Sequence, residues 1–165
     1  MRPPQVRFLC DHMLGSLAKW MRLLGYDTVY PGPLEDREMA AEVYEEGRVL
    51  LTRDKDLAAR VRGALFVSSD DLDEQLKSVV SALRLDLSNT LSRCSICNMP
   101  IVEVERAEVE RDVPPKVLEI QSKFWKCPSC SRIYWRGSHW KDMLGRIETL
   151  ESELGGSPSQ SSHKD

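Results

Sequence analysis

The sequence predicts an α/β fold, a three-layer domain with a parallel sheet, followed by a small β-rich zinc ribbon. In residues 1–88, short β-favouring runs alternate with segments that carry apolar residues at helical spacing. Such alternation is typical of βαβ units, in which helices cover both faces of a parallel sheet. In residues 89–154, two Cys-x-x-Cys pairs separated by 29 residues indicate a metal-binding module. Residues 155–165 are rich in Gly, Ser and Pro and are expected to be a disordered tail.

Four strands and four helices are expected in the first domain. The strands are expected at residues 6–10, 26–30, 49–52 and 64–68. The helices are expected at residues 13–24, from Asp36 to a stop at Gly47, at residues 57–62 and at residues 71–83. Asp36 is interpreted as the N-cap of its helix. Gly25 and Gly47 end two of the helices, as a glycine just past the last turn commonly does.

The second domain, residues 89–154, is predicted to combine the zinc ribbon with one C-terminal helix. Residues 85–93 are interpreted as a linker. Strands are expected near residues 101–104, 124–126 and 133–135, with a loop at residues 105–121. Ser138 is expected to cap the final helix, whose apolar face is predicted to dock on this same domain.

The composition describes a soluble globular protein, with 41% hydrophobic and 30% charged residues and a net charge of −3. No apolar run approaches the ~20 residues that a membrane span needs. The N-terminus shows no signal-peptide pattern, so a cytoplasmic location is expected. The absence of a Walker loop and of a dinucleotide-binding glycine pattern disfavours ATP or NAD chemistry.

Acidic residues stand where the predicted strands lead into helices. Asp11 follows the first strand, Asp36 begins the helix after the second, Asp54 and Asp56 follow the third, and Asp70 and Asp71 follow the fourth. Because the carboxyl ends of parallel strands meet at one edge, we expect these carboxylates along one crevice. Crowded carboxylates repel one another, and a divalent cation such as Mg²⁺ relieves the repulsion and also binds phosphate oxygens. The pattern predicts a catalytic metal site for phosphodiester hydrolysis.

Helix capping is the alternative role for each acid, because aspartate is a favoured N-cap. Asp70 and Asp71 are the strongest candidates for capping alone, and Asp56 could cap a helix that begins at Leu57. Asp11 is harder to explain as a cap, because it lies between a strand and a helix whose apolar face begins at Met13. The coincidence of acids at separate junctions indicates the site, rather than any one residue.

The four paired cysteines are predicted to bind one structural zinc ion; they are Cys94, Cys97, Cys127 and Cys130. Two thiolates of a Cys-x-x-Cys turn can face the same tetrahedral ion, and two such turns complete its coordination. A redox site is the alternative, but it needs a single pair beside a thioredoxin-like helix. The remaining cysteine, Cys10, is interpreted as an ordinary buried thiol.

A basic stretch without acidic residues, residues 121–141, surrounds the second cysteine pair and contains five of the eleven aromatic residues. Aromatic rings that stack on bases and cations that hold phosphates are typical of single-strand binding. The residues predicted to contact RNA here are Lys126, Arg132, Trp135 and Arg136. The alternative is that the aromatics fill a small core, with one of Trp125 and Trp135 inside and the other exposed.

Three sequence blocks resemble the Mut-seven C-terminal RNase family, a PIN-like group. They are residues 11–27 (DHMLGSLAKWMRLLGYD), residues 50–57 (LLTRDKDL), and the cysteine pairs with residues 134–140 (YWRGSHW). The resemblance implies a PIN-like fold, an appended zinc ribbon, RNA as substrate and a carboxylate site for Mg²⁺ or Mn²⁺. The acids that match are Asp11, Asp36 and Asp54, with Asp56 close by, whereas Asp70 and Asp71 fit only loosely as a fourth. The neighbouring basic residues expected near phosphate are Lys19, Arg22 and Arg53, although Lys19 and Arg22 also suit a solvated helix face.

The leading functional hypothesis is a metal-dependent endoribonuclease whose zinc ribbon grips RNA. A non-catalytic RNA- or ribosome-associated adaptor is the alternative, and the acids at Asp11, Asp36 and Asp54 weigh against it because an adaptor needs no clustered carboxylates. A toxin-type nuclease with an antitoxin partner is a third hypothesis, which the added ribbon disfavours. The sequence leaves open the RNA target, the base preference, the oligomeric state and the choice between Mg²⁺ and Mn²⁺.

Overall fold

A computed structural model of the chain describes residues 5–154, with every side chain except that of His139. The predicted tail at residues 155–165 lies outside the described residues. The central feature is a parallel sheet with the strand order β2-β1-β3-β4. Its strands are β1 (Phe8–Cys10), β2 (Thr28–Val29), β3 (Val49–Thr52) and β4 (Leu65–Phe66). The edge strands β2 and β4 are shorter than the sequence predicted, because each pairs on one side only.

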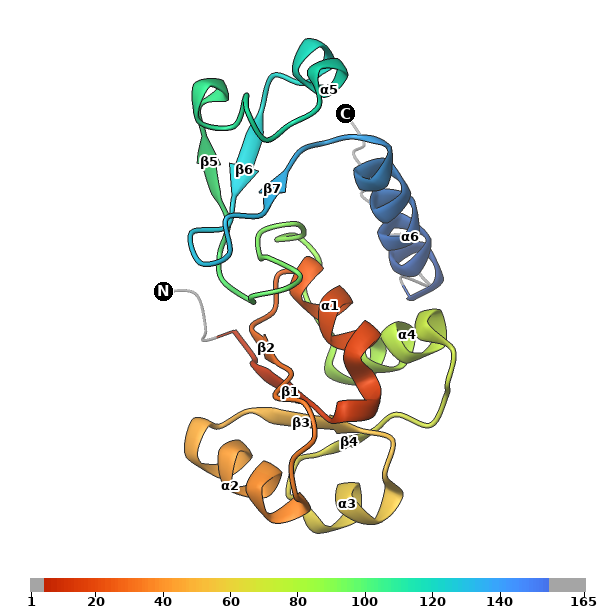
Figure 1. Ribbon diagram of the computed structural model, residues 1–165. Helices are drawn as coiled ribbons and strands as arrows, with labels where there is room; N and C mark the ends of the chain where they lie inside the picture. Colours follow the sequence, from red (N-terminus) through yellow and green to blue (C-terminus); the bar gives the residue numbers. More distant parts are fainter. Residues whose placement is uncertain (1–4, 155–165) are drawn as a thin grey trace, which may run out of the picture.

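Helices cover both faces of this sheet, as Figure 1 shows, and the predicted three-layer α/β architecture is confirmed. The helices are α1 (Gly15–Leu23), preceded by the 3₁₀ turn η1 (His12–Leu14), then α2 (Asp36–Glu46), α3 (Lys55–Arg60) and α4 (Leu72–Leu83). Helices α1 and α4 lie on one face, and α2 and α3 lie on the other.

The alternation of side chains along each strand builds two cores. Phe8 and Cys10 of β1 pack with α1 and α4, whereas Leu9 between them packs with α2 and α3. Leu51 and Leu50 of β3 divide in the same way. Successive side chains of a strand point to opposite faces, so a sheet that is covered on both sides requires apolar residues at every position. The apolar runs in the sequence reflect this constraint.

The strand order reverses at the carboxyl ends of β1 and β3, which is where the crevice of such a sheet is expected. The chain leaves β1 through α1 to reach β2 on one side, and then returns through α2 to β3 on the other side of β1. Ligands in open α/β sheets bind where the strand order reverses in this manner. Asp11 and Thr52 stand at this point, because Cys10 is in register with Leu51.

The ribbon is a second, antiparallel sheet of β5 (Val102–Val104), β6 (Phe124–Lys126) and β7 (Ile133–Tyr134). The buried ring of Phe124 packs with Val109 and Val113 in its small core. The loop expected at residues 105–121 instead contains η2 (Arg106–Glu108) and α5 (Pro115–Ile120). The signal for α5 was present in the sequence, because proline at the first helical position favours a helix start.

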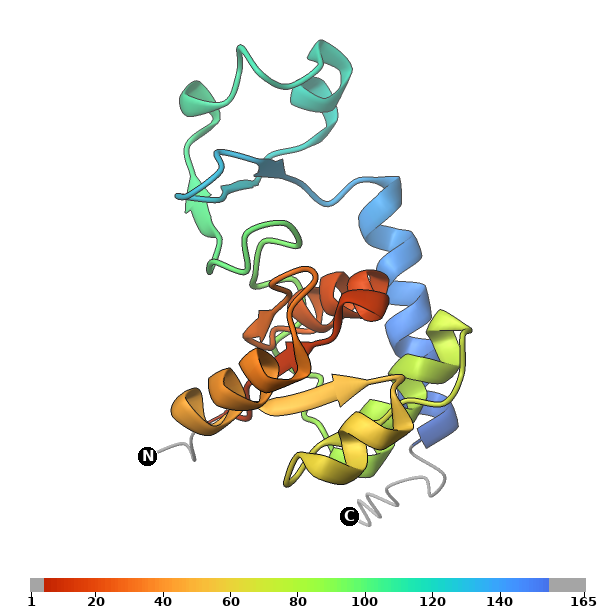
Figure 2. The ribbon, with the colours of Figure 1, turned by 60° about the horizontal axis from the view of Figure 1, so that its bottom comes forward.

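The last helix, α6 (Ser138–Leu154), contacts the ribbon through Trp140, but most of its apolar face packs on the first domain, contrary to the sequence-based expectation. Its residues Ile147 and Leu150 belong to the core formed by β1, α1 and α4, and Met143 packs with Leu23 of α1. Figure 2 shows α6 extending from the ribbon along α1 toward α4. The apolar periodicity of α6 predicted a buried face, but it does not encode which surface covers that face. No helix within residues 5–154 is long and apolar enough to cross a membrane.

The segment expected to be a linker, residues 85–93, is packed against the first domain. Leu91 is buried and its N–H donates to the Leu23 carbonyl oxygen at 2.6 Å. The Tyr26 hydroxyl donates to the Asp86 carbonyl oxygen at 2.7 Å. Gly25 has a left-handed φ of 96°, and a Cβ added there would lie 2.3 Å from the Asn89 carbonyl oxygen. A glycine is therefore needed where this segment crosses the end of α1.

We predict that Gly25→Ala destabilises the protein more than Gly47→Ala does. Gly47 also has a left-handed φ, of 66°, but a Cβ there would meet no atom within 4 Å. Gly47→Ala should therefore carry only the conformational cost of about 1–2 kcal/mol. Gly25→Ala should add a packing cost of about 1–3 kcal/mol, because residues 85–93 must shift. Urea unfolding of both variants measures the difference, and equal costs would contradict the close packing of this segment.

Candidate functional site

Asp11 is a buried carboxylate at the carboxyl end of β1, with only 3% of its surface exposed. Its N–H donates to the Leu51 carbonyl oxygen at 3.0 Å, which continues the pairing of β1 with β3. The Thr52 hydroxyl donates to Asp11 Oδ2 at 2.9 Å. Asp11 Oδ1 accepts the backbone N–H of His12 at 2.6 Å and lies 2.7 Å from His12 Nδ1. A buried charge needs such partners, and together they hold the carboxylate in one orientation.

Thr52 connects Asp11 to Asp54. The Thr52 hydroxyl donates to Asp11 and accepts the backbone N–H of Asp54 at 3.0 Å. Asp54 is exposed and is the N-cap of α3, where its Oδ1 accepts the N–H groups of Asp56 and Leu57 at 2.9 and 3.0 Å. Asp56 lies exposed within the first turn of α3, so the alternative that it caps this helix is wrong. Two acids therefore flank one threonine at adjacent strand ends.

Asp36 lies at the start of α2, but it is not the N-cap that the sequence suggested. The cap is Glu35, whose N–H donates to the Glu38 carboxylate at 2.9 Å. The Asp36 carboxylate instead accepts a hydrogen bond from Arg60 of α3 at 2.6 Å. After the fourth strand, Asp71 caps α4 by accepting the Glu74 N–H at 2.9 Å, which gives this acid a structural role.

The acids do not converge as closely as their placement in the sequence suggested. Among the described side chains, the cysteines form the only group of three or more His, Cys, Asp or Glu residues placed to share one metal ion. The structure thus links Asp11 to Asp54 through Thr52 and ties Asp36 to Arg60. Mg²⁺ commonly takes one or two carboxylates and completes its shell with waters and substrate phosphate oxygens. The arrangement of Asp11 and Asp54 fits a cation that takes few protein ligands. It does not fit a cation that is surrounded by carboxylates alone.

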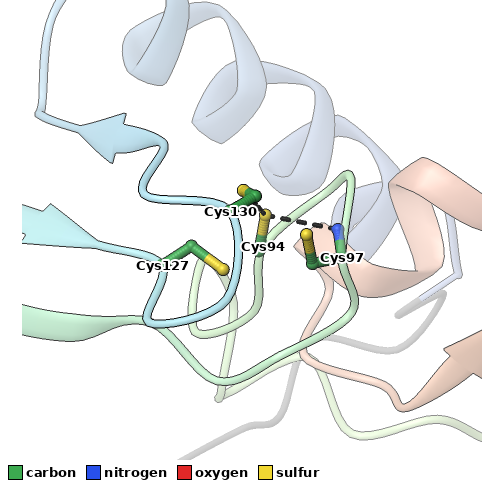
Figure 3. A group of neighbouring side chains, drawn as sticks. All are labelled: Cys94, Cys97, Cys127 and Cys130. Carbon is green, nitrogen blue, oxygen red and sulfur yellow. Dashed lines mark hydrogen bonds between the residues drawn. The ribbon is translucent and has the colours of Figure 1, made fainter.

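The four paired cysteines come together between the ribbon and α1, as Figure 3 shows. Their Sγ atoms all lie within 4.8 Å of one another, and the Sγ atoms of Cys94 and Cys130 are 3.8 Å apart. Four sulfurs at ~2.3 Å from one tetrahedral ion are separated by ~3.8 Å. The cluster therefore fits the four-thiolate site of a zinc ribbon.

Each cysteine pair forms a turn of the same design. The residue after each pair, Asn98 or Ser131, has a left-handed φ of 67° or 64°. The N–H of the first cysteine of each pair bonds to a carbonyl oxygen beyond the turn, Cys94 to Met99 at 2.8 Å and Cys127 to Arg132 at 2.9 Å. We call residues 94–99 the first knuckle and residues 127–132 the second knuckle.

The hydrogen bonds around Cys94 favour the ionised form of its thiol. Burial raises the pKa of its thiol, but hydrogen bonds from the Tyr134 hydroxyl, at 3.0 Å, and from backbone N–H groups of the first knuckle outweigh burial and lower the pKa to about 7. Burial and the contact with Cys94 raise the pKa of Tyr134 to about 12, so its hydroxyl keeps the donated proton. Cysteine binds a metal ion as the thiolate, and these contacts favour the thiolate form of Cys94.

Hydrogen bonds from Arg22 connect the first knuckle to the first domain. The alternative that Arg22 lies on a solvated helix face is wrong, because only 8% of Arg22 is exposed. Its Nε donates to the Thr28 carbonyl oxygen at 2.9 Å, and its Nη1 donates to the carbonyl oxygens of Ser95 and Ile96 at 3.0 Å. Asn98 completes the junction by accepting the Thr28 N–H at 2.9 Å.

An aromatic stack with a cation joins β6 of the ribbon to the start of α6. The rings of Trp125 and Trp140 lie parallel with centroids 6.0 Å apart, and Arg136 lies over both at 5.2 and 5.1 Å. Trp135 packs against the ribbon core instead. Neither Trp125 nor Trp135 is fully inside or fully exposed, so the expected division between them is wrong.

The other predicted RNA contacts lie at several places on the chain. Arg132 is exposed and Lys126 is partly buried in β6. Lys19 is exposed on α1. Arg53 follows Thr52 at the crevice, and its buried Nε has no hydrogen-bond partner among the described residues. Arg53 thus places a cationic side chain directly before Asp54.

Sequence reasoning missed the residues that position the site. Thr52 and His12 orient Asp11, and Tyr134 and Asn98 support the first knuckle. Thr52 stands two residues before Asp54, a spacing that lets its hydroxyl reach the following N–H, so a local signal existed. The partners of Tyr134 and Asn98 are 40 and 70 residues away, and no local pattern predicts them.

Comparison with known proteins identifies the family of this chain. A family model described as the Mut7-C RNAse domain matches residues 6–147. A human protein named "Exonuclease mut-7 homolog" is 33% identical over 125 residues, which cover 70% of this chain and 14% of the human protein. The chain thus corresponds to a small part of that relative's length. No solved structure matches the chain. The match over residues 6–147 shows that the chain belongs to the Mut7-C RNAse domain family.

Proposed function

We propose that this protein is a metal-dependent endoribonuclease that cleaves RNA at the crevice beyond β1 and β3. The observation that carries the proposal is Asp11, a buried and oriented carboxylate joined through Thr52 to Asp54 at the point where the strand order reverses. The family, an RNase domain by description, supports a nuclease. Asp54 and Asp56 are exposed on the rim of the crevice. An internal phosphodiester can approach this open rim without threading an RNA end.

Asp11 and Asp54 would hold a Mg²⁺ or Mn²⁺ ion, with Asp36 and Asp56 completing the acidic site. When bound, such an ion polarises the phosphodiester and lowers the pKa of a bound water. Thr52 and His12 keep Asp11 oriented. Arg53 offers its unpaired Nε to a phosphate oxygen, and Arg60 neutralises Asp36 until the site is filled.

A non-catalytic RNA-binding adaptor is the second candidate. The observation in its favour is the pairing of Asp36 with Arg60, which leaves the acids without a three-carboxylate cluster among the described side chains. An adaptor would bind RNA through the ribbon and would need no metal at the crevice.

We predict that Asp11→Asn, Asp36→Asn and Asp54→Asn each reduce RNA cleavage more than about a hundred-fold, beyond the usual cost of changing an outer-shell partner. Asparagine preserves the size and most of the capping ability of aspartate while removing the charge that binds the metal. The free energy of unfolding should stay near that of the wild type. Cleavage of linear and circular RNA in Mg²⁺ and Mn²⁺ measures the effect and tests endonucleolytic attack.

Asp71→Asn is the matched control for these variants, because Asp71 caps α4 as Asp54 caps α3. It should retain wild-type cleavage. Cleavage that survives both Asp11→Asn and Asp54→Asn, or that persists when divalent cations are omitted, would rule out this site. A wild-type protein that binds RNA and cleaves none would support the adaptor.

We further propose that the four cysteines hold one zinc ion, and we predict that Cys127→Ser abolishes its binding. Binding of zinc is coupled to folding in such modules, so the ribbon should lose its structure. The change should leave β1 to β4 and their helices largely folded. Elemental analysis and tryptophan fluorescence measure the two effects.

Cys10→Ala is the matched control, because Cys10 is buried in the first domain away from the knuckles. It should retain one zinc per chain. Purified wild-type protein that lacks zinc and whose paired cysteines are all alkylated rapidly under native conditions would contradict the assignment.

The aromatic stack of the ribbon is proposed to bind RNA, and we predict that Arg136→Ala and Trp125→Ala weaken that binding. Loss of one phosphate contact should lower the slope of log affinity against log salt by about 0.7 for a single strand. Loss of a stacking ring should cost about 1–3 kcal/mol of binding free energy. Fluorescence anisotropy with a labelled oligonucleotide measures both quantities.

Arg146→Ala provides the matched control, because Arg146 lies over Trp20 at 5.5 Å in a similar pair away from the ribbon. It should leave RNA affinity and the salt slope unchanged. If Arg136→Ala behaves like Arg146→Ala, the ribbon stack is structural.

A further inference from the structure

A groove of about 380 Å³ runs between α1, the end of β2 and the first knuckle. Its lining includes Ser16 and Lys19 of α1, Tyr30 after β2, Ser95 and Ile96 of the first knuckle, and the buried Arg22. The two sides of the groove therefore belong to different parts of the chain. One is the nuclease-type domain and the other is the ribbon.

The charge of the groove suits a phosphate. Lys19 is exposed at its rim, whereas the charge of Arg22 is buried behind the wall formed by Ser95 and Ile96. No aspartate or glutamate belongs to the lining. A concave surface lined by one sign of charge between walls of low dielectric concentrates that potential. The groove therefore attracts anions although the protein as a whole is acidic, with a net charge of −3.

Tyr30 and Ile96 give the groove an apolar surface. Their exposed fractions are 37% and 48%, and both belong to the lining. The Tyr30 hydroxyl donates to the His12 carbonyl oxygen at 2.6 Å, which holds the ring in place. It also lies 3.1 Å from where a Cβ of Gly15 would be, so the ring packs closely over the start of α1. A ring fixed in this way is preorganised for a base to stack on it.

The groove has the correct position to join the two parts of the proposed site. At one end, Tyr30 bonds to His12, the neighbour of Asp11. At the other end, Ser95 and Ile96 lie between the two cysteines of the first knuckle. Arg22 holds that wall of the groove in place through the Ser95 and Ile96 carbonyl oxygens.

We propose that this groove binds single-stranded RNA on its way from the ribbon to the Asp11 crevice, with Lys19 on a phosphate and Tyr30 under a base. The identity of the strand as RNA rests on the proposed function. A single strand exposes the base faces that stack on a tyrosine, whereas a duplex keeps its bases paired and stacked inside. The ribonucleotide strand should therefore bind more tightly than the same sequence in a duplex.

Binding of a labelled 12-nucleotide uridine oligomer tests the proposal. Anisotropy is measured at several salt concentrations with divalent cations omitted, so that the probe remains intact. Lys19→Gln should weaken binding and lower the salt slope by about 0.7, the value for one phosphate contact to a single strand. Tyr30→Leu should weaken binding about five-fold to a hundred-fold, whereas Tyr30→Phe, which keeps the ring but loses the bond to His12, should weaken binding less than Tyr30→Leu does.

Lys116→Gln is the matched control, because Lys116 is an exposed lysine on α5 of the ribbon, outside the lining of the groove. The proposal is overturned if Lys19→Gln and Tyr30→Leu keep wild-type affinity and salt slope. It is also overturned if Lys116→Gln lowers both as much as Lys19→Gln does, or if a duplex binds as tightly as the single strand.

The same variants separate this proposal from the nuclease function. If RNA binding depends on Lys19 and Tyr30 but no cleavage follows when Mg²⁺ or Mn²⁺ is added, the RNA-binding groove is supported and the nuclease function is contradicted. If cleavage depends on Asp54 while Lys19→Gln and Tyr30→Leu bind and cleave as the wild type does, the nuclease function is supported and the RNA-binding groove is contradicted.

Discussion

The buried guanidinium of Arg22 joins the two parts of this molecule. It is positioned by α1, and it donates hydrogen bonds to Thr28 in the sheet and to Ser95 and Ile96 in the first knuckle. Burial lowers the pKa of Arg22, while the nearby thiols of Cys10, Cys94 and Cys97 favour its charged form. A divalent ion held by four thiolates would be net negative, so Arg22 and the loaded cysteine cluster would stabilise each other. Without this contact, the orientation of the ribbon toward the sheet would depend on fewer bonds.

The acidic crevice shows a different balance between stability and chemistry. Asp11 is buried and satisfied by Thr52 and His12, so its charge is tolerated in the folded state. Asp54 combines two roles, because the same carboxylate caps α3 and faces the crevice rim. Asp36 is neutralised by Arg60. These contacts stabilise acids at several strand ends of one sheet edge.

The ribbon is not an independent appendage. Residues 85–93 pack against the end of α1, and α6 returns from the ribbon to the core beside α1 and α4. The first domain therefore contains side chains from both ends of the described chain. Leu91, Met143 and Ile147 belong to the clusters that pack these segments against α1 and α4.

Local sequence features alone determined much of the structure of this protein. Apolar periodicity, glycine stops and aspartate junctions predicted the order of β1 to β4 and their helices, and the spacing of Cys94, Cys97, Cys127 and Cys130 predicted one metal cluster. These features depend on neighbours a few residues apart, whose geometry the backbone dictates. The same is true of the left-handed turns after each cysteine pair.

Contacts between distant residues were decided only by the tertiary structure. Arg22 follows the pattern of an exposed helix residue, yet it is buried because the first knuckle, more than seventy residues later, covers it. The apolar face of α6 would suit any apolar surface, and packing selected α1 and α4. The acids were predicted to share one edge of the sheet. The residues that donate hydrogen bonds to their oxygens come from other elements, Thr52 for Asp11 and Arg60 for Asp36. Sequence spacing sets which groups are available, whereas competition among all possible partners for burial and hydrogen bonds sets which of them meet.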